Sequence, residues 1–208
     1  MSATAQRSQH QTTTTDMPPA ITLRLRPVVN LTSDQLLELS SLNDDLRFEL
    51  TAEGELVVMA PAGGKASAGN ARITAQLTVW AVQDDTGIAF DSSGGFELPN
   101  GAKLSPEASW VALTQWKALT SKQQEQFPPL CPDFVIELTS PSDRIPALKR
   151  KMAEWIDNGA RLGWLIDPDT KRVYVYRPNA PVKQLENPAS VSGEPVLPGF
   201  ALDLRAIW

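Results

Sequence analysis

The chain has 208 residues, of which 42% are hydrophobic and 21% are charged, and its formal net charge is −5 at pH 7. This composition is typical of a globular protein with a sizeable core and excludes a wholly disordered chain. The acidic balance argues against a protein that coats nucleic acid through charge alone, because phosphate binding requires a basic surface. A local basic groove is still compatible with it, since net charge does not describe how the charges are distributed.

Cysteine and histidine are too scarce for several kinds of active site. Cys131 is the single cysteine, so an intrachain disulfide is impossible and a cytoplasmic location is favoured. His10 is the single histidine and lies in the N-terminal tail, which argues against a histidine zinc site or a Ser-His-Asp triad. The catalytic groups that remain are carboxylates, lysines and hydroxyls.

The N-terminal segment is polar and low in complexity. It is rich in Thr, Gln and Ser and lacks the apolar segment of a signal peptide. We expect residues 1–20 to form a disordered polar tail and residues 21–208 to form a single domain. No run of 18 apolar residues occurs anywhere in the chain, so no transmembrane helix is predicted.

The first half of the chain predicts a helix, a hairpin and a second helix. Residues 32–35 have the pattern of a capping box and begin a short helix. Residues 47–50 and 55–59 flank a turn and predict a β-hairpin. A Gly-, Ala- and Ser-rich loop is expected from Pro61 to Gly69. An amphipathic helix that ends near Gly87 should follow, with these apolar residues on one face: Ile73, Leu77, Trp80 and Ala81.

The second half predicts short strands that alternate with helices. Strands are expected at residues 88–91, 95–98, 108–111, 134–138, 164–166 and 173–176, with a final edge strand near 200–204. Asn100-Gly101 predicts a turn between the second and third of these strands. Helices are expected at 114–126 and from Pro141–Asp143 to a cap at Asn158-Gly159. This order predicts an α/β (α+β) domain with a mixed sheet flanked by helices.

Two acidic residues stand where predicted strands could bring them together. Glu137 lies inside the apolar run 134–138, where a carboxylate is costly unless it is paired, protonated or bound to a cation. Glu107 stands at the entry to the strand 108–111. If the two strands pair, both carboxylates can converge on one divalent ion. The helix after Glu137 carries Lys149 and Lys151 on opposite flanks of its apolar stripe, and helical geometry alone does not choose between them.

Three blocks of sequence resemble the Uma-type restriction endonuclease family of the PD-(D/E)XK nuclease superfamily. They are PEASWV at 106–111, PDFVIELTSPSD at 132–143 and KMAEWIDNGARLGWLIDP at 151–168. The hairpin from Arg47 to Pro61 also fits, and the resemblance spans roughly residues 33–205. It implies a restriction-endonuclease-like core and an endonuclease that hydrolyses DNA with Mg²⁺ or Mn²⁺.

The resemblance also implies roles for individual residues. Glu107 takes the place of the first acid and Glu137 that of the second, so both would be metal ligands. The motif lysine normally follows the second acid by two residues, where this chain has Thr139, and its displaced equivalent on the helix is Lys151. Glu49 matches an upstream acid that adds a ligand or holds a water. Nucleic acid, with DNA favoured, is the expected partner, and a homodimer is expected because cutting two strands often uses two copies.

Each candidate residue also has a purely structural interpretation. Glu137 could bond to backbone N–H groups or to an arginine, Glu107 could be solvated, Lys151 could be a surface lysine, and Glu49 could pair with Arg47. Glu107 stands where the motif usually has Asp, and one added methylene displaces the carboxylate. A catalytically inactive nuclease-fold protein that binds nucleic acid or a protein partner is therefore the alternative, and a structural dimer module is a third possibility.

Overall fold

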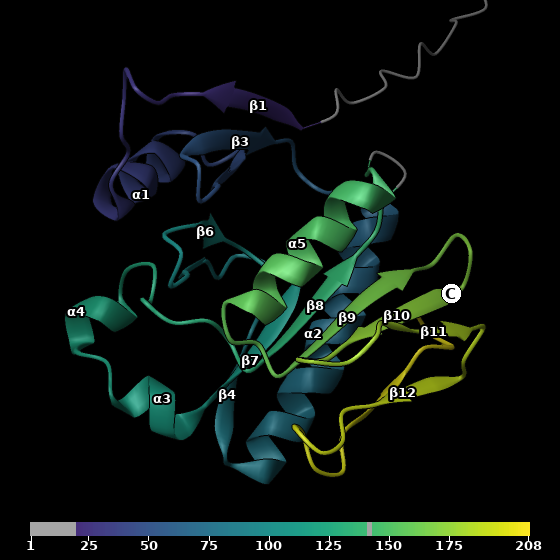
Figure 1. Cartoon of the computed structure of the whole chain (residues 1–208). Coiled ribbons are helices and arrows are strands. Elements are labelled where there is room, and N and C mark those ends of the chain that lie inside the picture. The colour runs from purple at the N-terminus through teal and green to yellow at the C-terminus, as the bar shows by residue number, and fades with distance from the viewer. Residues whose placement is uncertain (1–19, 141–142) are drawn as a thin grey trace, which may run out of the picture.

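A six-stranded mixed sheet forms the centre of the fold in the computed structural model, which describes residues 20–140 and 143–208 (Figure 1). β8 and β9 run parallel, and every other neighbouring pair in this sheet is antiparallel. Helix α5 (Ile145–Asp157) connects the parallel pair, as a crossover between parallel strands requires. In sheet order the strands are β11 (Lys183–Glu186), β10 (Arg172–Tyr176), β9 (Leu162–Asp167), β8 (Phe134–Leu138), β7 (Ala108–Ala112) and β4 (Gly87–Phe90).

One long helix covers each face of this sheet. α2 (Gly64–Asp84) lies against one face and α5 (Ile145–Asp157) against the other, as Figure 1 shows. Side chains along a strand alternate between faces, so Phe134 and Ile136 of β8 pack in the α2 layer while Val135 packs in the α5 layer.

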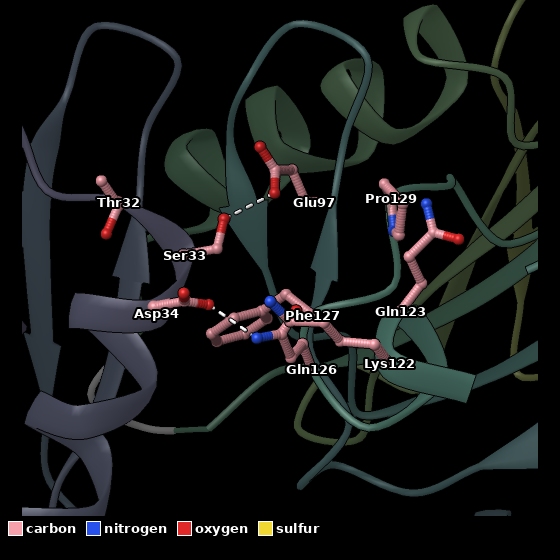
Figure 2. Close-up of a pocket in the computed structure, with 9 residues that line it drawn as sticks. All are labelled: Thr32, Ser33, Asp34, Glu97, Lys122, Gln123, Gln126, Phe127 and Pro129. Carbon is pink, nitrogen blue, oxygen red and sulfur yellow. Dashed lines mark hydrogen bonds between the residues drawn. The ribbon is translucent and has the colours of Figure 1, made fainter. Parts of the chain in front are cut away.

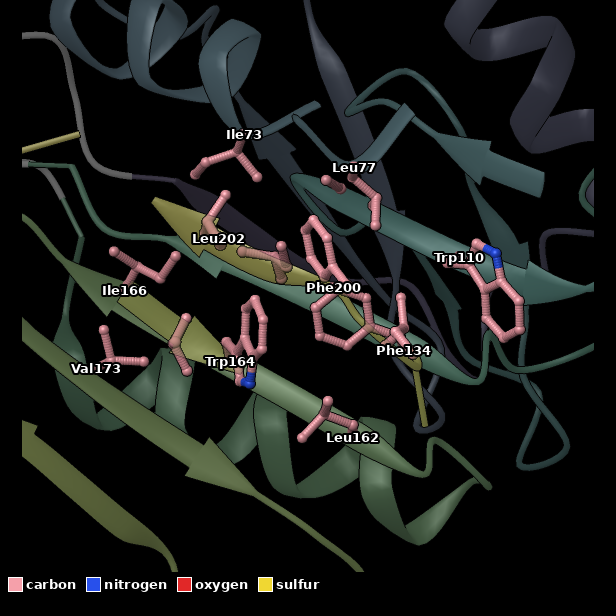
Figure 3. Close-up of a cluster of buried hydrophobic side chains, with 14 of the residues drawn as sticks. Ile73, Leu77, Trp110, Phe134, Leu162, Trp164, Ile166, Val173, Phe200 and Leu202 are labelled. Carbon is pink, nitrogen blue, oxygen red and sulfur yellow. The ribbon is translucent and has the colours of Figure 1, made fainter. Parts of the chain in front are cut away.

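Aromatic rings fill the layer between α2 and the sheet. The Phe134 ring packs edge-on against Trp164, with ring centroids 4.7 Å apart, and Phe200 stacks on Trp164 at 5.9 Å (Figure 3). Ile73 and Leu77 of α2 contribute to this layer and are fully buried. Burial of this apolar surface supplies most of the driving force that holds α2 on the sheet.

Helix α1 (Ser33–Leu42) packs against a second sheet, which has five strands. Leu36 of α1 is fully buried in a cluster with Phe48, Leu50 and Leu56 of this sheet. All of its strand pairs are antiparallel. In sheet order the strands are β1 (Ile21–Arg24), β3 (Glu55–Met59), β2 (Arg47–Leu50), β6 (Lys103–Leu104) and β5 (Phe96–Glu97).

The remaining elements are short. Two helices follow β7, and a two-stranded sheet lies near the C-terminus. Their bounds are α3 (Leu113–Lys117), α4 (Ser121–Gln124), β12 (Ser190–Ser192) and β13 (Ala201–Asp203). Within the described ranges, no helix combines the length and the apolar character needed to cross a bilayer.

The predicted mixed sheet flanked by helices is confirmed, together with several local elements. Thr32 and Gln35 form the expected capping box of α1, and the hairpin of β2 and β3 has the predicted bounds. The strand Phe134–Leu138 is also found as predicted, and Asn158 is the C-cap of α5. These elements depend on local patterns, which explains why the sequence alone predicts them.

Other predicted elements need correction. The loop expected at 61–69 is wrong in its second half, because α2 already begins at Gly64 after an extended N-cap at Gly63. The stretch 114–126 forms two short helices, because Thr120 caps a new helix through its own capping box with Gln123. The turn at Asn100-Gly101 joins β5 to β6, a strand that the sequence did not predict, and Gly101 has a φ of 87°, which favours glycine.

Four short strands were not predicted, namely β1, β6, β11 and β12. β1 and β11 are mostly exposed, and β6 and β12 have only two and three residues, so none of the four has a run of alternating residues long enough to identify a strand. α5 begins at Ile145, later than the expected start at Pro141–Asp143, and residues 141 and 142 lie outside the described part of the chain. The expected tail 1–20 also lies outside it, apart from Ala20.

Candidate active site

The two acidic residues singled out by the sequence stand at the same end of the β7–β8 ladder. The expected pairing of these strands is confirmed, with Ala108 opposite Ile136. Glu107 directly precedes the last paired residue of β7, Ala108, and Glu137 directly follows its partner Ile136, so the two acids flank the same end of the ladder. The Glu107 amide also donates to the Ile136 carbonyl oxygen at 2.9 Å, so the backbone of β8 fixes its position.

Glu137 lies on the α5 face of the sheet and is only 3% exposed. Its Oε1 atom lies 3.0 Å from the Lys151 ammonium nitrogen and accepts a hydrogen bond of 3.0 Å from the Trp155 indole nitrogen. Lys151 and Trp155 are four residues apart on α5, so both side chains lie on the same helix face. The buried carboxylate is therefore paired with a lysine and an indole, and no backbone amide or arginine of the described residues bonds to it.

Lys151 joins two carboxylates that come from different sheets. Its Nζ atom lies 2.8 Å from Glu49 Oε1 in β2 and 3.0 Å from Glu137 Oε1 in β8. It also donates to the Ser105 carbonyl oxygen at 2.9 Å. An ammonium group has three N–H donors, and these three oxygens are enough to engage all of them. Lys151 is thus a mostly buried bridge between the sheets, and its surface-lysine interpretation is wrong.

Lys149, the other lysine that the sequence left open, lies away from this cluster. Its Nζ atom lies over the Tyr174 ring, 4.1 Å from the ring centroid. The structure therefore selects Lys151 as the lysine that faces the acids, in agreement with the residue implied by the family resemblance.

Glu49 is 6% exposed and does not pair with its neighbour Arg47. Its Oε1 atom accepts a hydrogen bond of 3.0 Å from the Ser105 amide in addition to the contact with Lys151. Arg47 points instead toward Glu107. The two residues lie two apart in β2 and share one face of the strand, so both reach the site.

Glu107 is held by an arginine and an amide side chain, and its solvated interpretation is wrong. Arg47 Nη1 lies 3.3 Å from Glu107 Oε1, while Arg47 Nη2 donates to the Ser92 carbonyl oxygen at 2.9 Å. Asn70 of α2 donates from Nδ2 to Glu107 Oε2 through a short hydrogen bond. The Glu107 side chain is 17% exposed, so one edge of the site is open to solvent.

The cluster has more negative than positive charge. Three carboxylates, Glu49, Glu107 and Glu137, face two cations, Arg47 and Lys151. Burial raises the pKa of Glu137 to about 7, with Lys151 acting in the opposite direction and Glu49 and Glu107 adding to the rise. Burial would lower the pKa of Lys151, but the carboxylates of Glu137 and Glu49 outweigh it and raise that pKa above its ordinary value.

The donor set suits a hard divalent ion. Within the described residues, no group of three or more His, Cys, Asp or Glu side chains is arranged to hold a metal. Mg²⁺ needs fewer protein ligands, because it keeps several waters and binds through one or two carboxylates. Glu107 and Glu137 supply those carboxylates, and the Oδ1 atom of Asn70 is a buried oxygen without a hydrogen-bond partner in the described chain. The residues present therefore fit a Mg²⁺-type ion.

Sequence reasoning missed three contributors to the site: Asn70, Trp155 as a donor, and the backbone of Ser105. Asn70 could have been found, because it stands three residues before Ile73 on the buried face of α2, where a polar side chain is unusual. Trp155 was expected in the core, where it is fully buried, and nothing in the sequence indicated that its indole nitrogen reaches Glu137. The Ser105 contacts depend on the loop before β7, which has no sequence pattern.

A surface pocket lies elsewhere on the molecule (Figure 2). It is crossed by hydrogen bonds from Ser33 to Glu97, at 2.6 Å, and from Gln126 to Asp34, at 2.7 Å. None of the site residues lines it, and its polar groups pair with one another, so we assign it no part in the chemistry. The lining residues are Thr32, Ser33, Asp34, Glu97, Lys122, Gln123, Gln126, Phe127 and Pro129.

Comparison with solved structures supports the assignment of the fold. The chain is similar to the crystal structure of a "putative nuclease belonging to DUF820" from Anabaena variabilis ATCC 29413, with a TM-score of 0.70 and 20% sequence identity. The match covers 85% of this chain and 97% of the other. At this identity the likeness shows the fold alone, and it confirms the predicted nuclease-like core. No curated protein matches the chain.

Comparison with protein families assigns most of the chain. The sequence profile of Uma2, described as "Putative restriction endonuclease", matches residues 33–205. This range contains Glu49, Glu107, Glu137 and Lys151, and it agrees with the span of the resemblance seen in the sequence. The chain belongs to the Uma2 family.

Proposed function

We propose that the protein is a metal-dependent endonuclease that hydrolyses phosphodiester bonds in DNA, with Mg²⁺ or Mn²⁺ held by Glu107 and Glu137. The observation that carries the proposal is the placement of these two carboxylates at one end of the β7–β8 ladder, with the Lys151 ammonium 3.0 Å from Glu137. The family and its nuclease-like fold support the substrate class.

Each residue has a distinct part in this proposal. A bound divalent ion supplies Lewis-acid activation of the phosphate and of a water molecule. Glu107 and Glu137 offer the oxygen ligands, and Trp155 fixes the Glu137 carboxylate through its indole N–H. Lys151 supplies positive charge beside the reacting phosphate, where preorganised charge lowers the barrier. Glu49 holds the Lys151 ammonium in place at 2.8 Å.

One observation favours a second candidate, a nuclease-fold protein that binds nucleic acid without cutting it. The three N–H donors of Lys151 are matched by Glu49, Glu137 and the Ser105 carbonyl. To orient a water or a phosphate oxygen, Lys151 must release one of these acceptors. If the cluster is purely structural, the release does not occur and no hydrolysis follows.

A plasmid nicking assay tests the proposal and separates the two candidates. We expect the wild-type protein to convert supercoiled plasmid to nicked circles in Mg²⁺ or Mn²⁺, and EDTA to stop the reaction. Glu137→Gln and Lys151→Met should each lower the rate by at least about 100-fold, because each removes a group at the reacting centre. Lys149→Met is the matched control on the same helix and should keep the wild-type rate.

The results of the nicking assay distinguish an endonuclease from a protein that only binds DNA. Equal nicking by the wild type, Glu137→Gln and Lys151→Met would trace the activity to a contaminant and reject the endonuclease. A wild-type protein that retards DNA in a gel but never nicks it in either metal would establish the second candidate.

We also propose that the protein acts as a homodimer in the cytoplasm. β1 is an edge strand with exposed apolar side chains, Ile21 at 53% and Leu23 at 46%, and such edges pair readily with another chain. Sedimentation equilibrium should give a mass twice that of the 22.7 kDa chain. A monomer at micromolar concentration would refute this part alone.

A further inference from the structure

Asn70 is a buried amide whose two polar atoms differ in their surroundings. The residue is 8% exposed and lies in the first third of α2. Its Nδ2 atom donates to Glu107 Oε2, whereas Oδ1 is buried and has no hydrogen-bond partner among the described residues. Most buried polar atoms in proteins are satisfied, so an orphaned carbonyl oxygen beside a carboxylate cluster requires an explanation.

The orientation of the amide follows from the chemistry of its neighbour. An ionised Glu107 can only accept hydrogen bonds, so the amide atom that faces Glu107 Oε2 must be the Asn70 nitrogen, and the oxygen is the other atom on the same amide carbon. Reversing the amide would set two oxygens against each other. The orphaned atom is therefore the oxygen, which is the atom that a hard cation binds.

The fold places Asn70 close to the sheet. Gly69 precedes it, and a Cβ at position 69 would lie 2.8 Å from Leu138 Cδ2 of β8. The absence of a side chain at this position lets α2 approach the strand that carries Glu137. Asn70 is thereby brought to the end of the ladder from the side opposite α5, so the site receives side chains from both covering helices.

Leaving a buried carbonyl oxygen unpaired is unfavourable, so a partner is favoured whenever one can enter. The adjacent charges indicate the kind of partner. Two cations, Arg47 and Lys151, face three carboxylates, and neither cation is bonded to Asn70. A further positive ion beside Glu107 would satisfy the oxygen and reduce the excess of negative charge.

We propose that Asn70 Oδ1 is a third protein ligand of the divalent ion at this site, in addition to Glu107 and Glu137. The inference rests on the proposed metal dependence and adds a neutral oxygen from α2 to the two carboxylates from the sheet. Asn70 has two functions in this arrangement. Its N–H group orients Glu107, and its carbonyl oxygen binds the ion.

Titration of the metal-free protein with Mn²⁺, followed by the electron paramagnetic resonance signal of the free ion, measures this directly and requires no nuclease activity. We expect Asn70→Ala to weaken Mn²⁺ binding by about tenfold or more, the effect typical of losing a group at a metal site. Gln76→Ala is the matched control, because Gln76 is another amide of α2 whose nitrogen and oxygen both bond to the Asp203 backbone. It should bind Mn²⁺ as the wild type does.

Asn70→Asp separates a ligand from a residue that only orients Glu107. An aspartate keeps the oxygen but loses the N–H donor and repels Glu107. If Asn70 is a ligand, the carboxylate should restore binding to within a few-fold of the wild type. If Asn70 only orients Glu107, Asn70→Asp should bind as weakly as Asn70→Ala or more weakly, and the ligand assignment falls.

The remaining outcomes distinguish this inference from the proposed function. Mn²⁺ binding that depends on Glu107 and Glu137 but is unchanged in Asn70→Ala would overturn the inference and leave the proposed function intact. A folded wild-type protein that binds no Mn²⁺ at millimolar concentration would overturn both. Circular dichroism of each metal-free variant confirms that it is folded before the titration is interpreted.

Discussion

Replacing Lys151 by methionine should reveal how strongly the buried charge cluster depends on one ammonium group. Methionine keeps most of the side-chain stem and removes the charge. Glu49 and Glu137, which are 6% and 3% exposed, would then face each other without the cation that lies 2.8 Å and 3.0 Å from them. Their remaining side-chain and backbone donors are the Trp155 indole and the Ser105 amide.

The structure sets the expected loss of stability in Lys151→Met. Removing one partner of a buried ion pair typically costs about 3 to 5 kcal/mol, because the other charge is left uncompensated. Both carboxylates keep one hydrogen-bond donor, so we expect the lower end, about 3 kcal/mol at pH 8. For a chain of this length that loss corresponds to a Tm lower by about 6 to 12 °C.

The loss should depend on pH, and the sign follows from Glu137. Its pKa is raised from 4.5 to about 7 in the folded protein, so the folded state holds a proton that the unfolded state has released between these values. Stability therefore falls as the pH rises through this window. Lys151 lowers the Glu137 pKa, so its removal raises that pKa further and extends the window upward. The destabilisation by Lys151→Met should thus be large at pH 8 and small at pH 5.

Urea denaturation followed by tryptophan fluorescence, at pH 5 and at pH 8, measures this difference. Lys149→Met is the control, since its ammonium lies over the Tyr174 ring and contributes about 0.5 to 1 kcal/mol at an exposed site. A loss below about 1 kcal/mol at pH 8 would show that Lys151 does not compensate the buried carboxylates. An equal loss at both pH values would show that protonation of Glu137 does not set the pH dependence.

Three further predictions concern the surroundings of the site and the core. Trp155→Phe removes the indole donor to Glu137 and should lower the free energy of unfolding by about 2 kcal/mol in urea denaturation, and an unchanged value would show that this hydrogen bond is not needed. Burial raises the pKa of the Cys131 thiol to about 12, so native protein at pH 8 should react with a thiol reagent only as fast as it unfolds, and instant labelling would contradict its burial. We also propose that residues 21–208 form one domain, so fluorescence and circular dichroism should report a single coincident unfolding transition, and two separate transitions would divide the chain.

Local elements of this fold were predictable because their causes are local. The capping box at Thr32 requires only the side chains of residues 32 and 35, and the strand 134–138 is a short apolar run between breakers. The hairpin 47–59 follows from alternation around a Gly-containing turn. The short strands β1 and β6 were not predicted, because they are defined by pairing, β1 with β3 and β6 with β5 and β2, and not by a pattern of their own.

The site residues divide in the same way into those that the sequence predicted and those that depend on tertiary packing. The sequence identified Glu137 as a carboxylate in a buried strand and Glu107 as an acid at the entry to a strand that could pair with it, and the resemblance to a family added Glu49 and the choice of Lys151. It could not decide between Lys149 and Lys151 from helical geometry, because both flank the apolar stripe and only packing against β2 and β8 distinguishes them.

The sequence by itself determined which chemical groups are available to the site. They are carboxylates and a lysine, with no histidine among them, and they stand on strands and a helix whose patterns are local. The tertiary structure alone decided the partners of each group. Arg47 bonds to Glu107 and not to Glu49, and Asn70 joins the cluster from a helix on the opposite face of the sheet. The physical reason is that these contacts join residues far apart in the chain, so their geometry is set by how the two sheets and the two covering helices pack.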